Sequence, residues 1–307
     1  MSEACPRKNN HMKFSFIKHR NIWFALSGLM IVASLVAIAA FGFNFGIDFT
    51  GGSIMELNFQ SRPTVDEVQT VLSNNGHQHS IIQPSGDSKM IIRLEALDEV
   101  AHQAVLSSLK EKDSGMTELQ FNSFGPSVGS ELRKKTITGV VVTLILIGLF
   151  IAAAFRKVSE PVQSWKYGLI TIIAGFHDVI VPLGLFAVLG HFYGWQVDTA
   201  FVAAALTILG YSINDTIVVF DRTRENLHKL EGDFGDIVDK SIQQTLFRSL
   251  YSSLTTMLAL IAIFIWGGES TRPFALALFV GIGIGTYSSI FIASPLLVAW
   301  EELRKGK

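Results

Sequence analysis

The segment of residues 201–225 is apolar and long enough to cross a lipid bilayer, yet it carries an aspartate, Asp215, in its interior. A membrane span needs about 20 mostly apolar residues at a rise of about 1.5 Å each, and Asp221 marks where this one ends. Asp215 then lies about 9 Å inside the hydrocarbon edge. Because an aspartate at the centre of a span costs about 2.5–3.5 kcal/mol, we expect Asp215 to face protein or water and to be functional. The alternative is a structural role, in which Asp215 is a buried carboxylate whose hydrogen bonds are supplied by neighbouring helices.

Five other apolar runs are long enough to span the membrane: 22–43, 137–155, 167–189, 250–266 and 274–300. Hydrophobic residues make up 49% of the 307 residues and charged residues 17%, and the apolar residues are gathered in blocks. This pattern predicts a polytopic α-helical membrane protein with six transmembrane helices, the last five of them within residues 137–300. With an even number of spans, both termini lie on one side of the membrane.

Lysine and arginine residues in short loops predict which side that is. They are concentrated in the tail of residues 1–21, in the loops after the second and fourth spans, and in the tail of residues 301–307. By the positive-inside rule these segments face the cytoplasm. A basic cluster at 133–135 lies on the opposite side, but it belongs to a long translocated segment, where the rule is weak. The connection 221–247 has apolar residues at helical spacing, which predicts short amphipathic helices on the cytoplasmic face.

Residues 44–136, between the first and second spans, are expected to form a small extracytoplasmic α+β domain. Strands are expected at 53–59, 80–83, 89–94 and 118–124, and helices at 64–75 and 98–112. The first helix opens with the capping pair Thr64 and Glu67, and residues 84–87 form a turn cluster between the second and third strands. The order β-α-β-β-α-β is that of a ferredoxin-like split motif.

Polar residues in the spans point to a candidate site around Asp215. Ser212 and Asn214 are close to Asp215 in the sequence, and we expect them to add polarity to the same interior face. Arg248 lies near the cytoplasmic entry of the next span, so it and Asp215 can meet at similar depth.

The third span carries His177 and Asp178 near its middle. Such a pair is costly in lipid and should face the helix bundle. A packed hydrogen-bonded clamp and a member of a proton relay fit these residues equally well, because the sequence shows no continuous path. In the last span, Gly281 and Gly285 are four residues apart and form a small-residue motif for close packing of membrane helices.

Several motifs match one known family: GIDFTGG at 46–52, FHD at 176–178, GYSINDT running into VVFDRTRE across 210–225, and SLTT at 253–256 after Arg248. Together they resemble the SecD/SecF family of protein-export membrane proteins, in its SecF branch, from the first span to the last. The motif at 210–225 is highly specific. The family pattern also falls on Gly46, Asp48, Gly51, Gly52, Asp221 and Arg222.

The resemblance implies a fold that is one half of a resistance-nodulation-division (RND) type transporter. It implies a protein that is not an enzyme but acts with SecD, using the proton-motive force to promote preprotein translocation through SecYEG in the bacterial inner membrane. Asp215 aligns with the family's proton-coupling aspartate and Arg248 with its arginine on the next helix, and the other essential aspartate belongs to SecD.

The partners implied are SecD, SecYEG, YajC, YidC, unfolded preprotein and membrane lipid, without nucleic acid. Protons are the coupling ion and no cofactor is expected. A metal site is not expected either, since a single cysteine, Cys5, provides no cysteine cluster.

The coupling hypothesis rests on two general effects. A desolvated carboxylate holds its proton more tightly, and a nearby arginine weakens that hold. A helix motion that brings Asp215 and Arg248 together or separates them would therefore change how tightly Asp215 holds its proton. Proton uptake and release at Asp215 would in this way be coupled to helix movement.

Two alternatives remain. A small-molecule RND exporter is the closer one, although its porter domains are usually larger than residues 51–126. An intramembrane aspartyl protease would use two facing carboxylates, Asp178 and Asp215, but the sequence lacks the typical protease surroundings.

Overall fold

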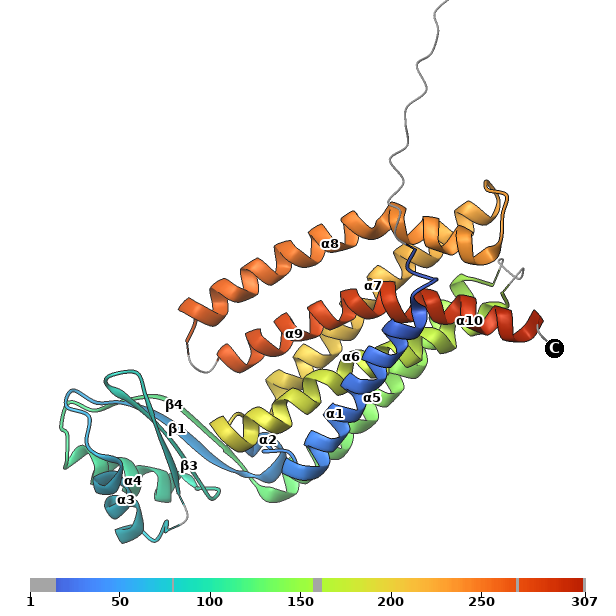
Figure 1. Cartoon of the computed structure of the whole chain (residues 1–307). Coiled ribbons are helices and arrows are strands. Elements are labelled where there is room, and N and C mark those ends of the chain that lie inside the picture. Colours follow the sequence, from blue (N-terminus) through green and yellow to red (C-terminus); the bar gives the residue numbers. More distant parts are fainter. Residues whose placement is uncertain (1–14, 79, 157–161, 269–270, 306–307) are drawn as a thin grey trace, which may run out of the picture.

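A computed structural model describes residues 15–78, 80–156, 162–268 and 271–305. Cys5 in the N-terminal tail lies outside the described residues. The chain folds into a bundle of long helices with a small α+β domain at one end (Figure 1). The predicted fold class is confirmed, and the six long apolar helices make the chain a multi-pass membrane protein.

Each predicted span corresponds to one long helix. The first five are α1 (Arg20–Phe41), α5 (Pro126–Ala154), α6 (Ser164–Tyr193), α7 (Thr199–Leu227) and α8 (Phe234–Trp266). The sixth consists of α9 (Arg272–Ser288), a π-helical turn η1 (Ser289–Ala293) and α10 (Ser294–Lys305). The π-helical turn was not predicted, and it interrupts the sixth helix at the second of two consecutive serines, Ser288 and Ser289.

Burial divides these helices into an inner and an outer set. The sixth helix, α6 and α7 are the most buried, whereas α1, α5 and α8 expose most of their apolar surface. Leu29 on α1 and Phe150 on α5, for example, are 65% and 64% exposed. Such surfaces suit contact with lipid or with another membrane protein. α8 lies at the edge of the bundle, along α7 and α9 (Figure 1).

The α+β domain follows α1 and a single helical turn, α2 (Ile47–Thr50). Its elements are β1 (Gly52–Asn58), α3 (Val65–Asn74), β2 (Ile81–Ser85), β3 (Lys89–Leu94), α4 (Glu99–Lys110) and β4 (Thr117–Phe124). The strands form an antiparallel sheet in the order β2-β3-β1-β4, which confirms the predicted α+β domain. Met55 and Leu57 on β1 and Ile92 on β3 are fully buried in a core shared with α3 and α4. The capping box of Thr64 and Glu67 is present at the start of α3.

Two local predictions were wrong. Pro84 and Ser85 belong to β2 rather than to the turn, and β2 is an edge strand, where a proline without an N–H group is tolerated. Residues 221–247 do not form separate short helices, because α7 continues to Leu227 and α8 begins at Phe234. The side chain of Asp233 caps the start of α8 by accepting a hydrogen bond from the N–H of Gly235.

Candidate functional site

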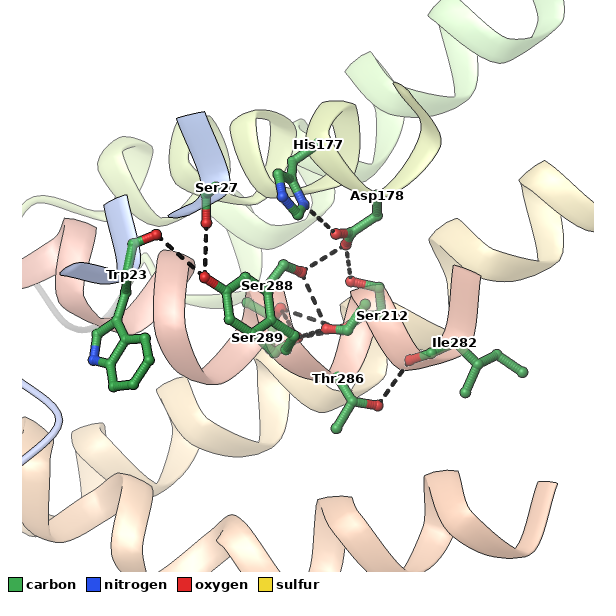
Figure 2. A network of polar contacts seen from close by, with 12 residues as sticks. Trp23, Ser27, His177, Asp178, Ser212, Ile282, Thr286, Ser288 and Ser289 are labelled. Atoms are coloured by element: carbon green, nitrogen blue, oxygen red, sulfur yellow. Dashed lines mark hydrogen bonds and ion pairs between the residues drawn. The ribbon is translucent and has the colours of Figure 1, made fainter. Parts of the chain in front are cut away.

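The carboxylate of Asp178 joins three of the inner helices. Asp178 lies on α6 and is fully buried. Its Oδ2 atom accepts hydrogen bonds from the hydroxyl of Ser212 on α7, at 2.5 Å, and from that of Ser288 on α9, at 2.7 Å. Its Oδ1 atom lies 3.0 Å from Nδ1 of His177 (Figure 2). The geometry is that of a hydrogen-bonded clamp, one of the two alternatives left open by the sequence.

The π-helical turn begins beside this clamp. The hydroxyl of Ser289 donates to the carbonyl of Ser212 at 3.0 Å and lies 2.8 Å from the hydroxyl of Thr216 (Figure 2 shows Ser288, Ser289 and Ser212 together). Within the turn's own helix, the hydroxyl of Ser294 donates to the carbonyl of Ser289. Hydroxyl groups from α7 and from the sixth helix therefore bond to each other and to nearby carbonyls where the regular α-helical pattern is interrupted. π-Helical turns are frequent at functional sites.

Asp215 lies on α7 one turn beyond Ser212, and 3% of it is exposed. The hydroxyl groups of Ser249, Ser253 and Thr286 surround its carboxylate. Ser253 and Thr286 also bond to each other, at 2.5 Å. The Oδ2 atom of Asp215 is buried and has no hydrogen-bond partner in the described part of the chain. A buried acid with an unsatisfied oxygen is suited to bind and release a proton.

Arg248 does not form an ion pair with Asp215 among the residues that the structure describes. It is exposed on α8 and, with Gln244, lines a groove of about 440 Å³ between α7 and α8. Asp221 and Glu225 on α7 line the same groove.

Asn214 does not share the interior face of Asp215, and this prediction was wrong. Asn214 is exposed, whereas Ser212 and Asp215 are buried. The physical reason is the helical period of 3.6 residues, which places residues three apart on one face and turns the neighbour of Asp215 away by about 100°. Asn214 lies on the outer side of α7 with Thr207 and Gly210.

The glycine-rich segment at 46–52 connects the bundle to the α+β domain. Asp48 accepts hydrogen bonds from the N–H of Thr199 at 3.0 Å and from its hydroxyl at 2.6 Å, at the start of α7. Gly51 and Gly52 have φ angles of 77° and 132°, which residues with a side chain rarely adopt. A Cβ atom on Gly46 would lie 2.9 Å from Cβ of Asp198. These residues are required by the backbone path and by close packing.

Asp221 and Arg222 lie at the far end of α7 and make local ion pairs. Asp221 pairs with Arg224 at 2.5 Å, and Arg222 pairs with Glu225 and donates to Gln244 on α8 at 2.7 Å. The bond from Arg222 to Gln244 therefore ties α7 to α8 near the Arg248 groove, whereas the ion pair of Asp221 stays within α7. No group of three or more potential metal ligands occurs in residues 15–78, 80–156, 162–268 and 271–305.

Ser288, Ser289 and Thr286 are site residues that the sequence did not single out. Two consecutive serines inside an apolar run were the available signal, but serine is common in membrane helices because its hydroxyl bonds its own backbone. The protease alternative gains no support, because Asp178 and Asp215 share no hydrogen bond in the described residues and belong to separate hydroxyl clusters.

Comparisons with known proteins agree on one family. Residues 104–303 match the family model "Protein export membrane protein SecD/SecF, C-terminal", and residues 36–61 match the model "SecD/SecF GG Motif". The protein translocase subunit SecF of Sebaldella termitidis is 38% identical over 96% of this chain and 94% of its own length. The SecF subunit of Haemophilus influenzae is 39% identical over 91% of this chain and 83% of its own length.

Solved structures show the same fold. The crystal structure of SecDF from Thermus thermophilus, described as a translocon-associated membrane protein, has a TM-score of 0.80 and 35% sequence identity over 97% of this chain. A SecDF structure in a super-membrane-facing form has a TM-score of 0.69 over 98% of this chain. In both cases the chain spans 40% of the SecDF polypeptide.

Proposed function

Because the chain belongs to the SecD/SecF family of protein-export membrane proteins, we propose that it acts with SecD to couple the proton-motive force to preprotein translocation. The observation that carries the proposal is the buried carboxylate of Asp215, whose Oδ2 atom is left without a hydrogen-bond partner in the described residues. Binding a proton there would remove a charge from the membrane interior. Protons are the coupling ion in this proposal, and neither a cofactor nor an enzymatic reaction is part of it.

The movement of Arg248 supplies the coupling step in this proposal. Arg248 is exposed in its groove and lies on the helix that also carries Ser249 and Ser253 of the Asp215 site. A shift of α8 toward α7 would bring the guanidinium to the deprotonated carboxylate, and protonation of Asp215 would release it. A proton that crosses the membrane releases about 2.3 kcal/mol per 100 mV, which is available to drive such a shift.

SecD is expected to bind the exposed face formed by α7 and α8. Thr207, Gly210 and Asn214 are exposed on α7, and Ser252 and Thr255 are exposed on α8. Polar side chains on a membrane helix favour contact with protein over contact with lipid. An adjoining subunit there would also cover the Arg248 groove.

The remaining parts of the proposal concern location and partners. The chain resides in the bacterial inner membrane with both termini in the cytoplasm and the α+β domain outside. It acts beside SecYEG, with YajC and YidC as further partners, on unfolded preprotein. Loop charges support the orientation, and the family membership supports the partners.

Replacement of Asp215 tests the proposed function. In vesicles that contain the complete export machinery, Asp215→Asn should lower preprotein translocation to the rate without a proton gradient, because an amide does not exchange a proton at neutral pH. Glu231→Gln, which removes an exposed acid from the turn between α7 and α8, is the matched control and should keep full stimulation. Full gradient-dependent stimulation by the Asp215→Asn protein, inserted and assembled normally, would rule out the proposed role.

A further inference from the structure

A cavity of about 240 Å³ lies between the sheet of the α+β domain and the adjacent end of the helix bundle. The helices α3 and α4 cover the opposite face of the sheet, so that Ile54, Glu56, Ile91 and Arg93 alternate with buried core residues and line the cavity. All four strands contribute to this lining, and segments 46–48 and 194–198 form the other wall. The cavity is thus a defined space between two parts of the fold.

Several polar groups around the cavity lack partners. The side-chain amides of Gln120, Asn122 and Gln196 form no hydrogen bond within the described residues. Arg93 donates from Nη1 to the amide oxygen of Gln83 at 3.1 Å, but its Nε is buried without a partner in the same described part of the chain. Gln120 is exposed and Asn122 and Gln196 are half-buried, so their amides are open to a ligand in the cavity, whereas the Nε of Arg93 is buried. Because a buried donor normally has a hydrogen-bond partner, the Nε of Arg93 indicates an acceptor that the described chain does not supply.

The acids of the cavity are already engaged. Asp48 accepts two hydrogen bonds from Thr199, and Asp198 accepts one at 2.8 Å from the N–H of Phe201. Glu56 pairs with Lys89 at 3.1 Å. The open groups are therefore mostly neutral amides with both donor and acceptor atoms, which suits a ligand with the same neutral hydrogen-bonding groups.

We propose that this cavity binds a short extended stretch of polypeptide by its main chain. Amide side chains pair with peptide N–H and C=O groups whatever the sequence, and Ile54 and Ile91 offer apolar contact to the side chains. The volume is below the about 300–1,000 Å³ of pockets for drug-sized ligands, which fits a few residues of chain rather than a folded partner. This inference rests on the proposed function, because it takes the occupant to be preprotein on the outer side of the membrane.

Photocrosslinking in the assembled export complex tests the proposal. A photoreactive amino acid is placed at position 120 or 122, at the cavity, and a preprotein is arrested during translocation. The control position is Val100 on α4, which is 79% exposed on the other side of the sheet. Positions 120 and 122 should crosslink to the preprotein several-fold more strongly than position 100.

Two results would overturn the proposal. One is crosslinking to the preprotein at positions 120 and 122 no stronger than at position 100, in complexes that keep proton-dependent stimulation. The other is crosslinking at these positions to SecD alone, which would make the cavity a subunit interface. In either case gradient-dependent stimulation in the same vesicles would show that the proposed function still holds.

A paired substitution provides a second measurement. Gln120→Ala combined with Asn122→Ala should reduce the crosslink formed from a third cavity position, Gln196, and should slow translocation. Gln103→Ala, which removes an exposed amide from α4, should change neither. An undiminished crosslink from position 196 in the double variant would count against binding by these amides.

Discussion

Asp178 shows how a single carboxylate determines the arrangement of three membrane helices. It accepts hydrogen bonds from Ser212 on α7 and Ser288 on α9 while bonded to His177 on its own helix. Membrane interiors offer no water to replace these bonds. The position of Ser212 also determines that of Asp215 one turn along α7, so the clamp holds the candidate proton site in place.

We predict different effects for two substitutions of Asp178. Asp178→Ala leaves the donors of Ser212 and His177 unpaired, at about 1–3 kcal/mol for each buried group, whereas Ser288 keeps its bond to the carbonyl of Gly285. The variant should therefore have a sharply lower melting temperature in detergent. Asp178→Asn keeps one acceptor oxygen and should be milder. If Asp178→Asn assembles normally and retains proton-dependent export, the residue acts as a clamp, and loss of that stimulation at normal stability would instead indicate a relay.

The sequence identified the acids of the site because a charge inside an apolar run is conspicuous. It could not identify the serine partners of Asp178, since a helical serine or threonine commonly satisfies itself on the backbone, as Thr171 does on Tyr167. The distance between Asp215 and Arg248 was also beyond prediction, because it depends on side-chain directions between two helices. The roles of these two residues in proton coupling stay predictions.

At the scale of elements, close contact between α7 and α9 depends on glycine. A Cβ atom on Gly285 would lie 2.8 Å from Cβ of Ser212, and one on Gly281 would lie 2.1 Å from Cδ1 of Ile208. Gly281 and Gly285, the predicted small-residue motif, therefore form the surface at which α9 contacts α7. Its neighbour Gly283 faces elsewhere, where a Cβ atom would lie 3.6 Å from Cε of Met257.

We predict that Gly285→Ala destabilises the protein by about 1–3 kcal/mol, the usual effect of overpacking, because it pushes Ser212 away from Asp178. Gly283→Ala has room for the added methyl group and should be neutral or stabilising, by up to about 1 kcal/mol through helix propensity. Thermal unfolding of the two variants under identical detergent conditions measures the difference. Equal melting temperatures would show that the contact between α7 and α9 tolerates expansion.

The loop around Asp113 gives the α+β domain a dependence on pH. Hydrogen bonds from the N–H group of Ser61, and from those of Gly115 and Gln60, lower the pKa of the Asp113 carboxyl below its ordinary value. An acid with a lowered pKa stabilises the fold above its unfolded value of about 3.9, and this stabilisation is lost as the pH falls through the folded value.

We therefore expect the amides of Gln60 and Ser61 to lose protection as the pH falls from about 6 to about 3. Hydrogen exchange of the full-length protein, corrected for the intrinsic pH dependence of exchange, measures this. Asp113→Asn should weaken protection at both pH values and remove most of the difference between them. A wild-type protein with unchanged protection across this range would contradict the assignment.

At the scale of the whole molecule, short connections hold the α+β domain against the bundle. The N–H of Gly46 donates to the carbonyl of Val197 at 2.9 Å, and the N–H of Val197 donates to the carbonyl of Asn44 at 2.8 Å. The segment that leaves α1 is thus bonded to the segment that enters α7. Alternating and helical patterns in the sequence predicted the α+β domain and the helices. The pairing of residues 45–48 with residues 197–199, about 150 residues later, could not be predicted, because such contacts leave no local pattern in the sequence.

Gly51 is the residue at which this arrangement is most sensitive. It adopts a φ angle of 77°, and a Cβ atom there would lie 2.7 Å from Cα of Pro126 at the start of α5. Gly51→Ala should therefore displace the α+β domain from the bundle while leaving the six helices inserted. Gly125→Ala, with φ of −65° and open space around the added atom, is the matched control.

We predict that the Gly51→Ala protein keeps its yield in the membrane but loses export stimulation. Displacement of the domain would separate the two walls of the cavity and break the hydrogen bonds from Thr199 on α7 to Asp48. Limited proteolysis should cut near residues 46–52 faster than in the Gly125→Ala protein. Stimulation and proteolysis indistinguishable between the two variants would mean that the connection tolerates the added carbon. Faster proteolysis of the Gly51→Ala protein with full stimulation would instead show that the fixed position of the α+β domain contributes nothing to export stimulation.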